Sequence, residues 1–404
     1  MIAPGQRRRV LWTCVLGAFS AYLCLLFLTP IYPEIARDLR LRPDSLSLLL
    51  SIAPALSVLM NLPVGVLADR LGRRPLLLAG ALLLVAAQLL IWAAATPVPF
   101  AGSRVVLGLA IPFVASAAYA AVADAYAAAG RVQALGLVTA AVNLGQAGGY
   151  VGTALLAERL GWHVLALALL PIPALMLVLS AGMPEPPVAG PPTGTWPAMS
   201  AALRFLARPS NAAAALLATF VNGTGVSATF LLPFATRAQG LGTQPTALLL
   251  LVFLGTAVVA APLLGGVADR TGALGLLRLC LGVCAAALLA FAVAGPSLAV
   301  IIPVYAVLGG MVAASAALNT SLVVQAAQRT GTGTGAALGG LRLGQVLGPA
   351  VVMPAAAALY THVGLAAAVL LLAALCGVGL ALTLVREPAR RARKTVDVSG
   401  RESA

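Results

Sequence analysis

Charged residues gather in one short sequence that this apolar chain carries twice. Residues 64–75 read VGVLADRLGRRP, and residues 264–272 read LGGVADRTG. Carboxylates and guanidinium groups at this spacing suit ion pairs and contacts with helix ends rather than catalysis. Matching positions differ by 200 residues: Gly65, Asp69, Arg70 and Gly72 in the first copy correspond to Gly265, Asp269, Arg270 and Gly272 in the second. Only the first copy continues with two basic residues, Arg73 and Arg74, where the second has Ala273 and Leu274.

Two other arginines, Arg104 and Arg342, fall inside long apolar segments. A charge buried in a membrane bundle is expensive and usually lines a cavity or a pathway. Arg342 lies deeper, its partner in the repeat is Asn143, and we expect it to face the interior. For Arg104, which lies closer to a segment end, an alternative is that the side chain snorkels to the membrane surface.

The acidic residues bear on proton coupling. All eleven lie in loops or at the ends of predicted helices, and Glu34 and Asp124 are the candidates nearest a pathway. A carboxylate that exchanges a proton with solvent could trade protonation against solute binding. The two fixed arginines instead favour a substrate with some negative charge.

The residues that metal sites and nucleophilic catalysis use are sparse. The five cysteines all fall inside predicted helices, which favours small buried packing residues. The two histidines, His163 and His362, are interpreted as interfacial side chains rather than metal ligands. We therefore expect no catalysis and no cofactor.

The composition predicts an all-α membrane protein. Hydrophobic residues make up 61% of the chain and charged residues 9%, against about 25% charged in soluble proteins. Apolar runs of about 18 residues or more, long enough to cross a bilayer, recur throughout. Twelve spans are predicted, at residues 10–32, 45–68, 76–95, 99–122, 134–156, 163–182, 211–235, 245–268, 276–294, 297–320, 334–358 and 364–385.

The basic residues predict the orientation. The net charge is +14, but no soluble basic domain exists to bind nucleic acid. With both termini inside, cytoplasmic segments hold 18 Lys and Arg and outer loops hold five, as the positive-inside rule requires. We therefore expect a multi-pass protein of the cell (inner) membrane with cytoplasmic termini. The first apolar run is too long for a signal peptide and is read as a retained span.

Proline content and repeats divide the chain. A proline-rich cytoplasmic linker at 183–210 separates two six-helix halves, 1–182 and 211–385, and a basic tail follows at 386–404. Besides the charged sequence, NLGQAGGY at 143–150 matches RLGQVLGP at 342–349, and the two histidines also lie 199 residues apart. Such parallel repeats are typical of transporters with a central pathway.

The sequence from Gly65 to Arg74 resembles the loop 2–3 signature of the major facilitator superfamily. The resemblance implies a twelve-span fold that works by alternating access. It also implies that Asp69 meets span 11, Asp269 meets span 5, and Arg73 reaches Asp124, as latches that hold the cytoplasmic side shut. The alternative is a positive-inside anchor without a switching role.

A glycine pattern in spans 5 and 11 resembles the antiporter motif of the superfamily's exporters. It implies close packing between spans of opposite halves, in a twelve-span drug:proton antiporter. The first copy departs from the motif, since Tyr150 stands where proline is expected, and ordinary small-residue packing is the alternative. The positions are Gly136, Gly145, Gly149, Gly335, Gly344, Gly348 and Pro349.

In this fold, spans 1, 4, 7 and 10 line the cavity. Their polar residues are few, which favours a drug-like or amphiphilic solute. The resemblance implies proton-coupled efflux of such a solute, by what we expect to be a monomer in the bilayer. The alternatives are an importer of a small organic anion or nutrient, and a non-transporting sensor or scaffold. The candidate residues are Tyr22, Tyr119, Asn222, Ser227, Tyr305 and Asn319, with Gln146 and Gln345 beside them.

Overall fold

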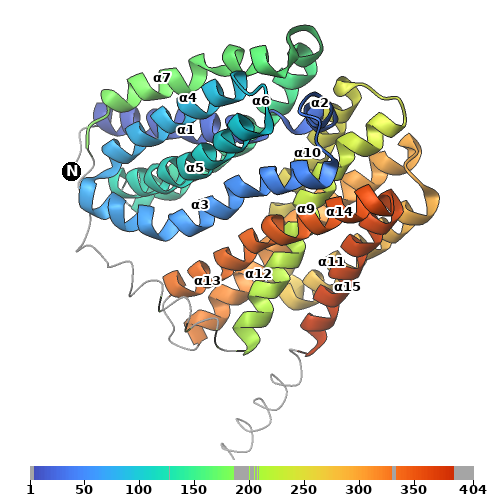
Figure 1. Cartoon of the computed structure of the whole chain (residues 1–404). Helices are drawn as coiled ribbons and strands as arrows, with labels where there is room; N and C mark the ends of the chain where they lie inside the picture. Colours follow the sequence, from blue (N-terminus) through green and yellow to red (C-terminus); the bar gives the residue numbers. More distant parts are fainter. Residues whose placement is uncertain are drawn as a thin grey trace, which may run out of the picture.

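The computed structural model describes residues 4–126, 128–185, 200, 204, 207, 209–329 and 334–385, and the described residues form helices joined by short turns (Figure 1). The predicted tail at 386–404 and most of the predicted linker lie outside this part of the chain. We refer to residues 4–185 as the N-terminal half and to residues 209–385 as the C-terminal half.

Most helices of each half pack on helices of the same half. In the N-terminal half, α1 packs on α5 and α6, and α4 packs on α5 and α7. Its elements are α1 (Pro4–Leu26), η1 (Thr29–Ile31), α2 (Tyr32–Asp38), α3 (Pro43–Leu71), α4 (Arg73–Trp92), α5 (Pro97–Ala125), α6 (Ala128–Leu169) and α7 (Pro171–Ala181).

In the C-terminal half, α10 packs on α12, and α11 packs on α12 and α15. Its elements are α9 (Pro209–Ala238), α10 (Thr243–Thr271), α11 (Ala273–Ala294), α12 (Leu298–Arg329), α13 (Thr334–Leu347), η2 (Gly348–Val352), α14 (Met353–His362) and α15 (Leu365–Val385).

Eleven segments of the described chain are long and apolar enough to cross a membrane. The twelfth predicted span is accounted for by the segment Gln133–Ala181, whose 49 residues contain both span 5 and span 6. A Cβ at Gly145 would meet Phe19, and Met176 lies against Gly17, so residues 145 and 176 flank the same level of α1. The chain therefore turns back between them, and Gly161, with φ +72°, lies in this stretch.

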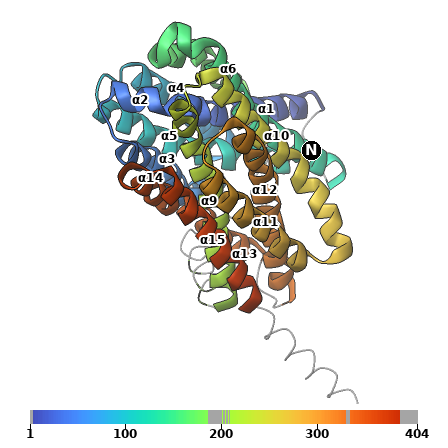
Figure 2. The same ribbon diagram turned by 90° about the vertical axis from the view of Figure 1, so that its right-hand side faces the viewer.

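The alternating helices give the bundle two sides. The linker side carries the turns at Gly72 and Gly272 and the end of α7, and the distal side carries residues 39–42 and 239–242. In Figure 1 the halves meet where α2, α10 and α14 lie and spread apart toward the linker side. Figure 2 agrees, with the upper end of α10 beside α6. Direct packing between the halves joins α3 to η2 and α14, and α6 to α10.

A π-helix, η2, interrupts predicted span 11 at Gly348–Val352. Pro354 has no N–H and lies five residues after Pro349, so π-type bonding leaves the Pro349 carbonyl without a backbone donor. The hydroxyl of Ser51 in α3 lies 3.3 Å from that carbonyl and shares its one proton with the Ser47 carbonyl, 2.8 Å away in its own helix. The break in the helix thus supplies a polar contact between the two halves.

Candidate functional site

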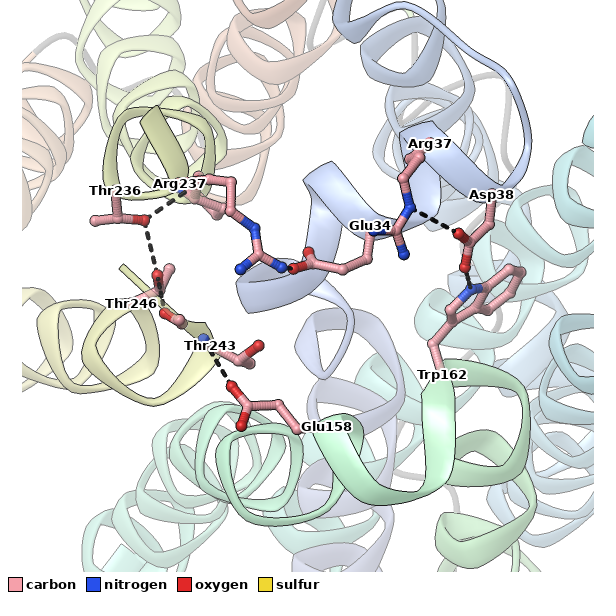
Figure 3. A network of polar contacts seen from close by, with 11 residues as sticks. Glu34, Arg37, Asp38, Glu158, Trp162, Thr236, Arg237, Thr243 and Thr246 are labelled. Atoms are coloured by element: carbon pink, nitrogen blue, oxygen red, sulfur yellow. Dashed lines mark hydrogen bonds and ion pairs between the residues drawn. The ribbon is translucent and has the colours of Figure 1, made fainter. Parts of the chain in front are cut away.

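An ion pair joins the halves on the distal side. Arg237, near the end of α9, contacts the carboxylate of Glu34 in α2 (Figure 3). The Glu34 side chain is 18% exposed, and its Oε2 atom is buried without a hydrogen-bond partner. A partly buried carboxylate between two moving bodies can couple protonation to their separation, because a proton removes the charge that holds the guanidinium.

A carboxylate at a helix N-terminus makes the second distal contact. Glu158 of α6 accepts a hydrogen bond from the backbone N–H of Thr243, the first residue of α10, at 3.1 Å. Beside it, the hydroxyls of Thr236 and Thr246 lie 2.7 Å apart and join α9 to α10 (Figure 3). Backbone N–H groups at a helix N-terminus favour negative charge, so this contact is electrostatically matched.

Other contacts also join the two halves on the distal side. His362 Nε2 of α14 lies 3.5 Å from Asp44 Oδ2 of α3. The rings of Tyr32 and Phe230 pack across the interface with centroids 5.7 Å apart. His163, by contrast, contacts the Ala94 carbonyl of its own half. All of these inter-half contacts lie at or near the distal side.

A cavity of about 260 Å³ lies beside this network, lined by residues of both halves that include Glu34, Glu158 and Arg237. Trp162 closes one wall and donates its indole N–H to Asp38 at 3.0 Å. The cavity is roomy enough for water, so solvent can reach the Glu34–Arg237 pair from the distal side.

On the linker side, Arg73 forms the contact that the resemblance implies. Its Nε lies 3.0 Å from Asp124 Oδ2, and Arg73 is 5% exposed. Glu185, just after α7, accepts from the backbone N–H groups of Arg73 at 2.5 Å and Arg74 at 3.1 Å. Both interactions lie within the N-terminal half, so they shape the Gly72 turn rather than join the halves.

The other residues of the charged sequences face outward. Arg70, Asp269 and Arg270 are exposed, and Asp269 makes no hydrogen bond or ion pair within the described part of the chain. Gly72 and Gly272 adopt φ of +95° and +96°, which only glycine adopts without strain. Gly265 lies inside α10, before the Gly272 turn, and the surroundings of Gly65 and the side chain of Asp69 lie outside the described residues.

Arg104 is buried in α5 at 1% exposure and does not snorkel to the surface. Its Nε donates to Ser103 Oγ at 3.2 Å, its guanidinium lies 4.9 Å from the centre of the Phe100 ring, and its Nη2 has no partner. Tyr32, which packs on the other half, is an electrostatic neighbour. Among the described residues, no carboxylate pairs with this buried cation, which lies close to the interface.

The glycine pattern packs helices within each half, which corrects the expected packing between halves. A Cβ at Gly145 would overlap the Phe19 carbonyl of α1, and one at Gly344 would overlap the Ala215 carbonyl of α9. The glycine face of α6 therefore packs on α1, and the glycine face of α13 packs on α9. The contact between α6 and the opposite half is made on the distal side, where Glu158 meets α10. Gly149 and Gly348 likewise approach α1 and α9, whereas Gly136 faces open space. The Pro349 carbonyl lies beside the Ser51 hydroxyl, as described above. The surroundings of Gly335 and the side chain of Arg342 lie outside the described residues.

We predict that Gly145→Ala destabilises the fold by about 1–3 kcal/mol, because the new methyl group forces α1 and α6 apart. Gly136→Ala is the matched control, since nothing lies within 4 Å of the Cβ that it adds. The measurement is the melting temperature of each purified variant in detergent. Equal melting temperatures for the two variants would contradict the close packing of α6 on α1.

Several cavity candidates instead hold neighbouring helices together. Tyr305 donates to the Ala228 carbonyl at 2.8 Å, and Asn319 donates to the Ala214 carbonyl at 3.0 Å. Asn222 donates to the Gln345 carbonyl. The remaining candidates, Tyr22, Asn143, Gln146 and Gln345, are half-buried, and Ser227 is buried.

A polar stripe on α5 was not predicted as a group. Tyr119 OH lies 3.1 Å from Thr139 Oγ1 of α6, and Ser116 Oγ donates to Asn61 Oδ1 of α3 at 3.3 Å. The stripe therefore joins α5 to two neighbouring helices of the same half, α3 and α6. The sequence alone indicated Tyr119. The pairs that join α5 to α3 and α6 could not be predicted from it, because they depend on how the three helices are rotated relative to one another.

Comparison with known proteins supports the fold. The chain resembles the structure of a bacterial homologue of the human lysosomal transporter Spinster in an inward-facing and occupied conformation (16% identity, 95% and 97% of the two chains covered, TM-score 0.77). It also resembles the nucleoside transporter NupG (14% identity, 94% and 99% covered, TM-score 0.79) and the human organic anion transporter MFSD10 (20% identity, 95% and 100% covered, TM-score 0.65). No curated protein matches the chain.

The family model described as Major Facilitator Superfamily matches residues 14–349, most of the chain. This agrees with the helical bundle of two halves and with the transporter structures that share the fold. The chain therefore belongs to the major facilitator superfamily, and it is a membrane transporter and not an enzyme.

Proposed function

We propose that this transporter exports an amphiphilic small molecule in exchange for protons, by alternating access of a site between its two halves. The linker side would face the cytoplasm, because the turns and termini there carry most of the basic residues. Both termini would then lie inside the cell (inner) membrane, and one chain would suffice for transport.

The described conformation corresponds to an inward-facing state under this proposal. Within the described part of the chain, the Glu34–Arg237 and Glu158–Thr243 contacts join the halves on the distal side, whereas Asp269 and Arg270 on the linker side are exposed. A bacterial homologue of Spinster that shares the fold was solved in an inward-facing conformation. Latching by Asp69 and Asp269 would belong to the opposite state, in which the linker side closes.

The Glu34–Arg237 pair is the observation that supports proton coupling most directly. It joins the halves, it is partly buried, and the neighbouring cavity gives it access to solvent on the distal side. Protonation of Glu34 would release Arg237 and favour opening toward the distal side, and opening would in turn expose the carboxylate. Asp124 is a weaker candidate, because its partner Arg73 belongs to the same half.

The proposed solute surface is apolar with few polar groups. Tyr119, Thr139, Ser116 and Asn61 offer hydroxyl and amide groups on the N-terminal half. Import of a small organic anion is the second candidate, supported by the unpartnered Nη2 of Arg104. Because Arg104 is 1% exposed in this state, an anion would reach it only after rearrangement.

The test is solute-driven proton movement in proteoliposomes with a pH-sensitive dye inside. Amphiphilic cations, neutral drugs and organic anions are added outside, and Asp69→Asn serves as the gate-dead control. We expect proton movement with one class of amphiphile and none with the control. Uptake of organic anions without proton movement would favour the second candidate, and no movement of any tested solute would contradict the proposed substrate class.

A further inference from the structure

The N-terminus of α10 depends on the other half of the protein for its cap. Its N-cap residue is Gly242, which has no side chain to offer, and its first turn contains no acidic residue. The hydrogen bond from Thr243 N–H to Glu158 supplies the missing acceptor. Helix N-termini leave N–H groups unpaired, and a side-chain acceptor there stabilises the helix.

Gly242 is suited to this contact by its size. Its φ of −78° and ψ of −173° are extended values that any residue adopts, so the backbone does not require glycine. A Cβ at this position, however, would lie 3.1 Å from Glu158 Oε1. A side chain at residue 242 would therefore obstruct the approach of Glu158.

The equivalent helix of the N-terminal half is capped differently. α3 begins at Pro43 and carries its own acid, Asp44, whose Oδ1 accepts from Ser45 N–H at 2.6 Å. That interaction lies within one helix end and survives any movement of the halves. The cap of α10 crosses the interface, so it is lost when the distal side opens.

We infer that Glu158 is a state-selecting residue, which caps α10 only while the distal side is closed and so raises the population of the linker-side-open state. This inference rests on the alternating access proposed above. It assigns a role to a residue that lies outside both charged sequences and both glycine patterns.

The same chemistry occurs within one half and provides a matched control. α4 also begins after a glycine, Gly72, with no acid in its first turn, and Glu185 accepts from its N–H groups. Because Glu185 and α4 both belong to the N-terminal half, this cap does not depend on the separation of the halves.

The experiment places nitroxide labels at Val98→Cys and Leu298→Cys, distal helix starts that are 78% and 42% exposed. The native cysteines Cys14, Cys24, Cys280, Cys284 and Cys376 are free and buried, so labelling is confined to the introduced pair. Pulsed electron paramagnetic resonance then gives the populations of distal-closed and distal-open molecules in nanodiscs. We expect Glu158→Ala to raise the distal-open to distal-closed ratio by about fivefold or more, and Glu185→Ala to leave it unchanged.

A second variant separates state selection from simple loss of stability. Adding Gly242→Asp to Glu158→Ala gives α10 a cap of its own in both states. We expect the melting temperature to recover while the distance distribution stays shifted. Recovery of both would indicate local unfolding of the first turn of α10 and overturn the inference.

The remaining outcomes are distinguishable. If Glu158→Ala leaves the ratio unchanged, or Glu185→Ala shifts it equally, Glu158 does not select a state. If the wild-type protein shows one fixed distance at every pH and with every solute, the proposed alternating access fails instead.

Discussion

Glu34→Gln is expected to reduce solute-driven proton movement to the leak of protein-free liposomes. Glutamine cannot titrate, so a cycle that carries its proton on this side chain loses coupling completely. Solute exchange between equal concentrations on both sides should persist, because it requires the halves to move but requires no net proton transfer. The measurement is the dye assay above beside counterflow of the same solute.

Two controls locate the effect on the ion pair. Arg237→Gln breaks the same inter-half contact but leaves Glu34 able to titrate, so proton movement should weaken without disappearing. Asp38→Asn alters a nearby carboxylate that contacts Trp162 and Arg37 within its own half, and coupling should be retained. Proton movement that survives Glu34→Gln at the wild-type rate would contradict the assignment of Glu34 as the proton carrier.

The ion pair also biases the conformational equilibrium, but modestly. Arg237 is 47% exposed, and pairs of this exposure contribute about 0.2–1 kcal/mol. Glu34→Gln should therefore change the ratio of distal-open to distal-closed molecules by no more than about fivefold in the label experiment. Under the proposed cycle, proton coupling would therefore rely on several weak distal contacts that release together.

The fold was predictable because its determinants are local in sequence. Apolar runs and intervening turns identify the spans, and the repeat at an offset of about 200 residues identifies the two halves. The predicted break between spans 5 and 6 contains Gly161, whose φ of +72° lies in the stretch where the chain turns back. The sequence pattern did not predict that one helical element, α6, would be assigned through this turn as far as Leu169.

The candidate site was only partly predictable. The Arg73–Asp124 contact follows from two helix ends that the fold brings to one side. The sequence did not indicate the caps by Glu158 and Glu185. Their carboxylates accept from backbone N–H groups, which every residue except proline has, so no particular residue type marks the partner. Glycine spacing indicated close packing, but the choice of α1 over the opposite half depends on how α6 is rotated.

The contacts of α3 and α10 suggest why the charged sequence occurs twice. Each of these helices ends in one copy on the linker side and begins at an inter-half contact on the distal side. When one half rocks against the other, contacts at the distal end of such a helix would break as contacts at its linker-side end form. Under the proposed cycle, the charged sequences and the distal contacts would therefore act alternately on the same two helices.

Arg104→Met is expected to separate stability from function. A buried charge without a carboxylate partner opposes folding, and replacing buried ionic groups with well-packed apolar residues is often neutral or stabilising by about 1–4 kcal/mol. Methionine should fill the space beside Phe100, so the melting temperature should stay level or rise. Transport should nevertheless fall by more than about tenfold, because an expensive intramembrane charge is retained for function.

Gln88→Leu is the matched control for this variant. Gln88 in α4 is fully buried, and both its Nε2 and its Oε1 lack hydrogen-bond partners, so its replacement should also preserve or raise the melting temperature. Gln88 has no contact with the opposite half among the described interactions, and transport should be unchanged. Arg104→Lys keeps the charge but loses the planar group beside Phe100, and should retain part of the activity.

The pair of readouts decides between two roles for Arg104. Loss of transport at an undiminished melting temperature would mean that the guanidinium acts in the cycle, on the solute or on the interface through Tyr32. A lower melting temperature for Arg104→Met would mean that the guanidinium holds the fold. Full transport activity in Arg104→Met would refute a functional role, and the unpaired charge would then be a stability defect that the bundle tolerates.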